Sequence, residues 1–503
     1  MKKERPNGRR GAVIFSAGLF LAVFVFYFAA HPLPLLDTDD WSYFAYARVA
    51  VPSPSFWNPS RVLPELLMPL CGILTAVLNA LFFHDYVTAQ VFTVALVFSL
   101  FITAYLAAFR RLLERRLALD LPASMLMTLL FLLLHFLIFR HAETGNRHLF
   151  YTVDVVCVFF YTIPALLCAA LVMWDLADDI YTDFFAPDRL LRKAFLLLLT
   201  YLAVFSNLYG SGILAVYAGC RLLFRLIRTL REKKPLSGFF RGELPRLLLL
   251  ALWLLAALCE MMGGRAAISL GEQLPLTVEL PRSMAALWRL CGEMNWLFLI
   301  LLGGAALLTA LLFFTRRKEE TSSFALLGLL LCTWLLCSLF ILLLCSVVSP
   351  DYANEPDASF GCFFYLLLLL CLAPALALKR RPRLLLLLPL ALVVIFSTIN
   401  TKSLTFADQN CLGVSARTVM AMDRDLIAQM READAAGLTE AVLVTMDTDN
   451  DYDNWPQSVF TMGDAMADLL WKHGVTGRRL HITLQPSREF NERYGLVFPS
   501  PSP

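Results

Sequence analysis

The chain has 503 residues, of which 58% are hydrophobic and 17% charged, and its mean hydropathy is +0.65. These values lie outside the range of soluble domains, and many apolar runs approach the length that spans a bilayer. The net charge of +3 comes from basic residues clustered between apolar segments, so it does not indicate nucleic-acid binding. The composition therefore predicts an α-helical multi-pass membrane protein.

The first apolar run, Val13–Ala30, follows a basic N-terminus and so resembles a signal peptide. No convincing small-residue cleavage site follows it, and the run is long enough to span a bilayer, so we interpret it as an uncleaved first helix. Lys and Arg accumulate on the cytoplasmic side of membrane proteins. The N-terminus is therefore predicted inside, and the segment Asp37–Arg61 outside.

The next apolar run, Leu63–Phe83, has two interpretations. If it crosses the membrane, most of the later basic clusters fall outside; if it lies along the outer surface or re-enters, all of them fall inside. Pro64 and Pro69 also make it a poor continuous spanning helix. We therefore predict that residues 31–86 form a first outer loop with a surface-lying helix. The basic clusters in question begin at Arg110, Arg189, Arg221, Arg316 and Lys379.

Ten further apolar segments complete the predicted transmembrane domain, residues 1–399. Together with the first helix they give about eleven crossings, an odd number that leaves the N-terminus inside and the C-terminus outside. The ten segments are Val87–Phe109, Leu117–Phe139, Val153–Trp174, Ala194–Phe205, Ile213–Ile227, Leu247–Met262, Trp296–Phe314, Phe324–Val347, Phe363–Leu378 and Leu384–Ile399.

From about Asn400 the composition changes to that of a soluble domain. Helical periodicity alternates here with short apolar runs typical of strands. The pattern predicts a small extracytoplasmic α/β domain over residues 400–503, about 100 residues long and within the usual size of a domain. Its expected elements are helices over Val414–Gly437 and Ser458–His473 and strands over Glu440–Met446 and Leu480–Leu484.

Three carboxylates, Asp37, Asp39 and Asp40, follow the first helix closely. One interpretation is a solvated loop in which Asp39 or Asp40 caps a helix beginning at Trp41. In the other, one carboxylate at a membrane-embedded cavity takes a proton from an attacking hydroxyl while a second holds a cation or orients the first. The pattern requires no cofactor, although Asp39 and Asp40 could hold a divalent cation such as Mg²⁺ or Mn²⁺.

The stretch Thr38-Asp39-Asp40-Trp41, followed by Asn58-Pro59-Ser60-Arg61-Val62-Leu63-Pro64, resembles the GT-C superfamily of membrane glycosyltransferases. The likeness is greatest to bacterial members related to the O-antigen glucosyltransferases, and Thr144-Gly145 with Tyr161-Thr162-Ile163-Pro164 adds to it. It covers the first 230 residues loosely. One departure is that Ser206–Ser211 has no acid where relatives are expected to carry one.

This resemblance implies transfer of a sugar, with inversion, from a polyprenyl-phosphate-linked donor to a cell-envelope glycan or lipid acceptor. The reaction would take place on the extracytoplasmic side of the bacterial plasma membrane. Asp39 or Asp40 would be the general base, with Asp37 and Glu143 as supporting acids. The donor phosphate would need cations, and Arg is favoured for bidentate contact. The candidates are Arg61, which we prefer, and Arg140, His141, Arg147 and His148, for which anchoring to lipid headgroups is an equal alternative.

Two rival functions stay open. A transporter or flippase of lipid-linked glycans would place ionisable residues in the middle of helices, whereas the charges here lie mostly at helix ends. A non-catalytic scaffold that displays the outer domain is the other. The sequence contains no phosphate-cradling glycine loop and no HExxH motif, and its twelve cysteines lack metal-site spacing. Cys345 and Cys362 flank a predicted outer loop and could pair, but two packed thiols are favoured.

Overall fold

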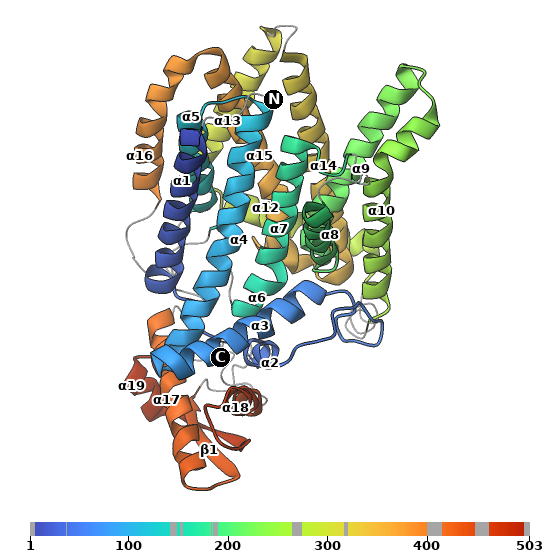
Figure 1. Ribbon diagram of the computed structural model, residues 1–503. Helices are drawn as coiled ribbons and strands as arrows, with labels where there is room; N and C mark the ends of the chain where they lie inside the picture. The colour runs from blue at the N-terminus through green and yellow to red at the C-terminus, as the bar shows by residue number, and fades with distance from the viewer. Residues whose placement is uncertain are drawn as a thin grey trace.

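The computed structural model describes residues 6–36, 38–140, 148–150, 154–182, 184, 190–263, 274–315, 320–399, 415–447 and 462–496. Long helices form a bundle, and a smaller group of helices and strands lies at one end of it (Figure 1). Among the described residues, eight helices are long and apolar enough to cross a membrane. Five of them have at most a third of their apolar stretch buried, as expected where lipid replaces protein as the neighbour.

Most bundle helices begin and end close to the predicted apolar segments. Asp85 and Asp120 cap the helices that follow them by accepting hydrogen bonds from the amides of Val87 and Ala123. The bundle consists of α1 (Pro6–Val25, continued as a π-helix over Phe26–Ala30), α4 (Tyr86–Arg116), α5 (Leu121–Leu137), α6 (Val155–Cys157, continued as the π-helix η3 over Val158–Thr162), α7 (Ile163–Asp178), α8 (Leu190–Val204), α9 (Leu208–Arg231), α10 (Leu236–Met261), α13 (Trp296–Phe314), α14 (Thr321–Val348), α15 (Phe360–Arg380) and α16 (Leu388–Thr398).

Helix α3 (Val62–Leu78) is drawn across the ends of the bundle helices rather than alongside them (Figure 1). A short helix, α2 (Thr38–Ala45), precedes it and packs on it at Gly72, where an added Cβ atom would overlap the carbonyl oxygen of Phe44. The close approach of the two helices therefore depends on the absence of a side chain at this position.

A network of buried charges joins α7, α9 and α10. Asp175 accepts hydrogen bonds from the Tyr217 hydroxyl at 2.8 Å and from the Arg246 guanidinium at 2.9 and 3.0 Å. Arg246 also pairs with Glu243 at 2.7 Å, and Glu243 pairs with Arg225 at 2.6 Å. Because each buried charge has a partner of opposite sign, the network fixes three helices without leaving an isolated ion in the bundle.

The C-terminal segment contains α17 (Ala416–Ala435), β1 (Glu440–Met446), α18 (Met462–Lys472), β2 (His481–Ser487) and α19 (Arg488–Tyr494). The two strands pair in parallel, with Glu440 opposite His481 and Met446 opposite Ser487. Parallel neighbours need a long crossover, and α18 lies within it. Gly437 and Gly474 follow α17 and α18 with φ of +78° and +67°, the left-handed conformation that ends helices at glycine.

The C-terminal segment is docked on the end of the bundle that carries α2 and α3. The Tyr86 hydroxyl hydrogen-bonds to Nδ1 of His473 at 2.7 Å, and Arg424 pairs with Asp85 at 2.9 Å. The Lys472 ammonium lies 3.0 Å from the centre of the Tyr46 ring. One continuous hydrophobic core extends from the bundle into α18 and the sheet.

The structure differs from the sequence prediction in two elements. Between the predicted crossings Leu247–Met262 and Trp296–Phe314, where no element was predicted, the structure has a helix, α12 (Leu276–Gly292). Helix α19 was not predicted either. The 400–414 segment, where the domain boundary was expected, lies outside the described residues. Cys345 and Cys362 are buried free thiols, the arrangement that the sequence favoured.

Candidate functional site

Asp39 and Asp40 lie in the first turn of α2 and therefore point in different directions. Successive residues on an α-helix are about 100° apart, so two adjacent carboxylates cannot share one face. Asp40 is fully buried, whereas Asp39 is exposed. The structure thus gives the two neighbouring acids different surroundings.

The Asp40 carboxylate is bound by backbone amides. It accepts hydrogen bonds from the amide of Leu36 at 2.7 Å and from those of Val155 and Val156, at the start of α6, at 3.4 and 2.5 Å. Helix N-termini favour negative charge, and these donors compensate for the loss of water around the buried carboxylate. Asp40 therefore ties the loop before α2 to the start of α6.

A polar cluster surrounds the turn from α2 into α3. Glu65 accepts hydrogen bonds from Arg48 and from Asn58, both at 2.9 Å, and Asn58 also donates to the Tyr43 hydroxyl at 2.9 Å. Burial, together with the negative charges of Glu65 and Asp39, raises the pKa of Tyr43. We call Asp39, Tyr43, Arg48, Asn58, Arg61 and Glu65 the α2–α3 polar cluster.

Arg61 stands directly before α3 and is 9% exposed. Its guanidinium lies 5.6 Å from the centre of the Phe160 ring, and the ring of Tyr43 lies 4.8 Å from that same ring. Within the described part of the chain, the guanidinium makes no hydrogen bond and no ion pair closer than 4 Å. The positive charge of Arg61 acts electrostatically on the Glu65 carboxyl group and on the Tyr43 hydroxyl.

A second group of acids, Asp154, Glu355 and Asp357, lies beside Asp40. Asp154 caps α6 by accepting from the amide of Cys157 at 2.7 Å, and Asp40, Asp154 and Asp357 all act electrostatically on the Cys157 thiol. Burial, reinforced by the charges of Glu355 and Asp154, raises the pKa of Asp357 to about 7. A carboxyl group with a pKa near neutrality can exchange a proton at working pH.

The remaining predicted residues are placed elsewhere or not described. The Arg140 side chain donates to the carbonyl oxygens of Gly292 and, at 3.1 Å, Met294, so it caps the end of α12. His148 is buried among aromatic rings, including that of Phe136 at 4.7 Å, and burial lowers its pKa well below the usual value. A neutral imidazole is a weak partner for phosphate. Four predicted residues lie outside the described residues: Asp37, His141, Glu143 and Arg147.

The predicted divalent cation would be held by Asp39 and Asp40. The carboxylate oxygens of Asp40 already accept backbone hydrogen bonds and Asp39 points elsewhere, so the two do not form a shared set of ligands. Across the described ranges, no three His, Cys, Asp or Glu side chains are grouped so as to hold a metal ion. The residues present do not fit a metal at this site.

Sequence reasoning assigned no site role to four members of the α2–α3 polar cluster: Tyr43, Arg48, Asn58 and Glu65. Glu65 lies inside an apolar run, where an acid is unusual because unpaired burial is costly. Glu65 follows Arg61 by four residues, a spacing that places two side chains on one face of a helix. This spacing was a signal from which the proximity of Glu65 and Arg61 could have been predicted.

The fold and its apolar helices define the class: the chain is a multi-pass helical membrane protein. Comparisons with protein-family models, with curated proteins and with solved structures found no match.

Proposed function

We propose that the chain is a GT-C-like glycosyltransferase that transfers a sugar from a polyprenyl-phosphate-linked donor to a cell-envelope glycan or lipid acceptor. The proposal rests on the resemblance of Thr38–Trp41 and Asn58–Pro64 to that superfamily, and on the chemistry of the α2–α3 polar cluster. The donor's lipid tail lies in the bilayer, so its phosphate meets the protein at the membrane surface. Residues that serve such a donor must therefore stand at one end of the helical bundle.

The observation that carries the proposal is the state of Arg61. Arg61 is 9% exposed as a residue, and the burial of a charged side chain is unfavourable unless an anion replaces the water it loses. The planar guanidinium can donate two parallel hydrogen bonds to two oxygens of a phosphate, and its face lies over the ring of Phe160. A phosphodiester-linked leaving group supplies a negative charge that can pair with Arg61.

The proposed topology has about eleven crossings, with the N-terminus inside and the C-terminal domain on the extracytoplasmic side. It is supported by the grouping of α2, α3 and the C-terminal elements at one end of the bundle, opposite the marked N-terminus (Figure 1). The basic ends of α4 and α9, at Arg115 and Arg231, agree with the positive-inside rule. The transverse direction of α3 supports a helix that lies on the outer surface.

In the proposed reaction Asp39 accepts the proton of the acceptor hydroxyl. The hydroxyl oxygen forms a bond to the anomeric carbon as the bond from that carbon to the phosphate oxygen breaks. The electron pair of the broken bond leaves with the polyprenyl phosphate, whose charge Arg61 neutralises. Asp40 positions the turn of α2 that carries Asp39, through its hydrogen bonds to Leu36, Val155 and Val156.

The experiment compares envelope glycans from cells that lack the protein and from cells that express it or a variant. Asp39→Asn and Arg61→Gln should each insert normally and fail to restore the missing sugar. We expect transfer to fall about 10²–10⁴-fold for Asp39→Asn, the usual contribution of a general base. Arg289→Gln is the matched control, because this arginine is exposed and its ion pair among the described residues is with exposed Asp351. Identical glycans with and without the protein, or full transfer by Asp39→Asn, would contradict the proposal.

The buried network of Asp175, Glu243 and Arg246 is the one observation that favours a transporter of lipid-linked glycans. Ionisable groups inside a helical bundle often mark a transport pathway. Here, however, the charges satisfy one another and fix α7 to α10, which favours a structural role. Vesicles containing the protein and a labelled lipid-linked sugar separate the two functions: a transporter moves the label across the bilayer unchanged, whereas a transferase moves it onto an acceptor.

A further inference from the structure

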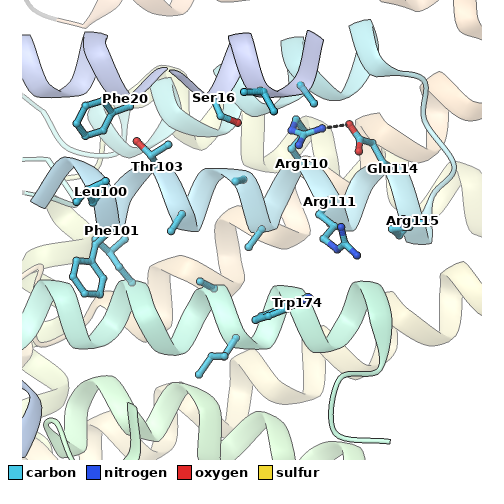
Figure 2. Close-up of a pocket in the computed structure, with 18 of the residues that line it drawn as sticks. Ser16, Phe20, Leu100, Phe101, Thr103, Arg110, Arg111, Glu114, Arg115 and Trp174 are labelled. Carbon is cyan, nitrogen blue, oxygen red and sulfur yellow. Dashed lines mark hydrogen bonds and ion pairs between the residues drawn. The ribbon is translucent and has the colours of Figure 1, made fainter. Parts of the chain in front are cut away.

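The length of α4 locates the two surfaces of the membrane. At one end of this helix Arg110, Arg111 and Arg115 line a lateral groove, together with Trp174 (Figure 2). Tryptophan and basic residues gather where hydrocarbon meets the headgroups, so this end marks one surface. About 20 residues of helix, or roughly 30 Å, cross the hydrocarbon, and counting back from Arg110 by that length leads to Gln90. The second surface therefore lies near the start of α4, at the end of the bundle that carries α2 and α3.

Helix α10 gives the same position for the second surface. Exposed Arg241 lies about 20 residues, or roughly 30 Å of helix, before Met261, the last residue of α10. Only 17% of the apolar stretch of α10 is buried, so most of this helix faces lipid. The exposed side chains between Arg241 and Met261 are all apolar: Leu244, Leu248, Ala251, Leu252, Leu254, Leu255 and Leu258.

The connection between α2 and α3, residues 46–61, lies against this end of α10 (Figure 1). We call it the α2–α3 loop. Glu260 accepts hydrogen bonds from the amide of Ser60 at 2.9 Å and from its hydroxyl at 2.5 Å. An added Cβ atom at Gly263 would overlap the ring of Pro59, so the loop and the chain after α10 are in direct contact. The α2–α3 loop therefore stands at the depth of the second membrane surface.

The α2–α3 loop turns apolar side chains outward and its charge inward. Val49, Val51 and Trp57 are each more than half exposed. Arg48 is the only charged residue in the sequence from 46 to 60, and its side chain is 4% exposed. A loop that faces water carries its charged side chains on the outside, so this arrangement is the reverse of the usual one.

Two side chains bind the backbone of the loop from within. The Arg48 guanidinium donates to four carbonyl oxygens at 2.6–3.3 Å, and the Tyr201 hydroxyl donates to a fifth at 2.6 Å. Three residues of the loop are prolines, which have no amide hydrogen to satisfy. Backbone groups enter lipid only where the protein itself provides their partners, and five carbonyls of the loop meet this condition. These carbonyls belong to Val49, Val51, Asn58 and Pro59, and to Ala50 for Tyr201.

We propose that the α2–α3 loop inserts into the membrane, with Val49, Val51 and Trp57 among the lipid chains just below the headgroups. The exposed apolar side chains continue the lipid-facing surface of α10, where Leu258 and Met261 are 58% and 63% exposed. Lipid is the occupant that this continuity supplies, because apolar side chains at the boundary gain by leaving water. Tryptophan is also the residue most typical of this depth. The inference does not depend on the proposed sugar transfer.

Photo-crosslinking of the full-length protein in phosphatidylcholine nanodiscs tests the insertion. The photoreactive residue p-benzoylphenylalanine replaces Trp57 or Val51 in separate variants, and mass spectrometry detects lipid adducts after irradiation. Both variants should form adducts, as should a variant at Leu335 of α14, which is 56% exposed on a membrane-spanning helix. Val442 of β1, 57% exposed, is the matched control outside the membrane and should form none. Absence of an adduct at Trp57 or Val51 when Leu335 forms one, or an equal adduct at Val442, would overturn the proposal.

Arg48→Met tests whether the internal partners of the backbone allow insertion. Methionine retains an apolar stem but donates no hydrogen bond, so four carbonyl oxygens lose the donor that Arg48 gives them. The adduct at Val51 should fall at least about tenfold, because unpaired carbonyls return the loop to water, while the adduct at Leu335 stays unchanged. Arg289→Met, at an exposed arginine outside the loop, should preserve both adducts. An undiminished adduct at Val51 in Arg48→Met would overturn the role assigned to Arg48.

Discussion

At the scale of single residues, Asp40 belongs to a local acidic motif but accepts hydrogen bonds from a segment that is distant in the sequence. One interpretation of the sequence was that Asp39 or Asp40 caps a helix beginning at Trp41. Asp40 instead binds the amides at the start of α6, 115 residues further along the chain. A capping interaction within one turn can be read from spacing, whereas this contact depends on how two segments meet in the folded bundle. The sequence therefore singled out the acidic stretch but could not separate the roles of its two acids.

Asp357 provides a pH-dependent prediction. Its pKa in the folded protein is about 7, raised by burial and by Glu355 and Asp154, so the folded chain keeps a proton that the unfolded chain releases above its ordinary pKa near 4. Stability is therefore lost as pH rises from about 4 to 7, by at most ~4 kcal/mol. Asp357→Asn should raise the melting temperature in detergent at pH 8 and leave it nearly unchanged at pH 4.

Asp351→Asn is the matched control, because this acid lies in the same loop but its side chain is 79% exposed. It should leave the pH dependence of melting as it is in the unaltered protein. If Asp357→Asn and Asp351→Asn give the same pH profile, Asp357 does not hold the proton assigned to it.

At the scale of elements, the turn from α2 into α3 depends on Gly72. A Cβ atom there would overlap the Phe44 carbonyl oxygen and lie 3.0 Å from Cε1 of His473, so Gly72→Ala must push α2 or α18 away. Overpacking of this kind destabilises by about 1–3 kcal/mol. We expect a lower melting temperature, and a loss of transfer because the displaced α2 carries Asp39.

Gly219 of α9 supplies the control for this prediction. An added Cβ atom there meets nothing within 4 Å, and alanine in a helix interior is favoured over glycine by about 0.5–1 kcal/mol. Gly219→Ala should therefore leave the melting temperature unchanged or raise it. A similar shift for both variants would mean that the packing of α2 on α3 is not tight at Gly72.

The sequence predicted elements well where hydrophobicity alone decides them. Helix α13 and strand β1 have the predicted bounds, Trp296–Phe314 and Glu440–Met446. Helix α12 was missed because Glu279, Arg282 and Arg289 give it a polar composition, although an amphipathic helix needs only one apolar face. Glu65 was missed for the opposite reason, since the apolar run around it hid the only acid in α3.

At the scale of the whole molecule, the C-terminal segment packs on the bundle through the same elements that form the candidate site. Helix α18 contacts α2 and reaches Tyr86 of α4 through His473, and Gly72 of α3 lies beside the same imidazole. The sequence patterns that indicated the transmembrane and C-terminal domains did not indicate this contact, because Tyr86 and His473 are 387 positions apart. Movement of the C-terminal segment would therefore alter the surroundings of Asp39 and Arg61.

The last prediction concerns the pH dependence of this docking. Burial, with the nearby positive charge of Lys472, lowers the pKa of His473 to about 4, whereas an undocked histidine titrates near its ordinary 6.5. The undocked state therefore binds a proton between pH 6.5 and 4 that the docked state excludes, and docking weakens as pH falls through this window and is constant above it. At pH 5 the docked state should lose about 2 kcal/mol relative to pH 7.5, or roughly 30-fold in the docking equilibrium.

Amide hydrogen exchange in α18 and the start of α4 measures this change. His473→Gln keeps a hydrogen-bonding side chain that does not titrate, so it should abolish the effect, whereas His481→Gln, at an exposed histidine in the same segment, should preserve it. Exchange that is equally slow at both pH values in the unaltered protein would mean that His473 does not couple docking to protonation.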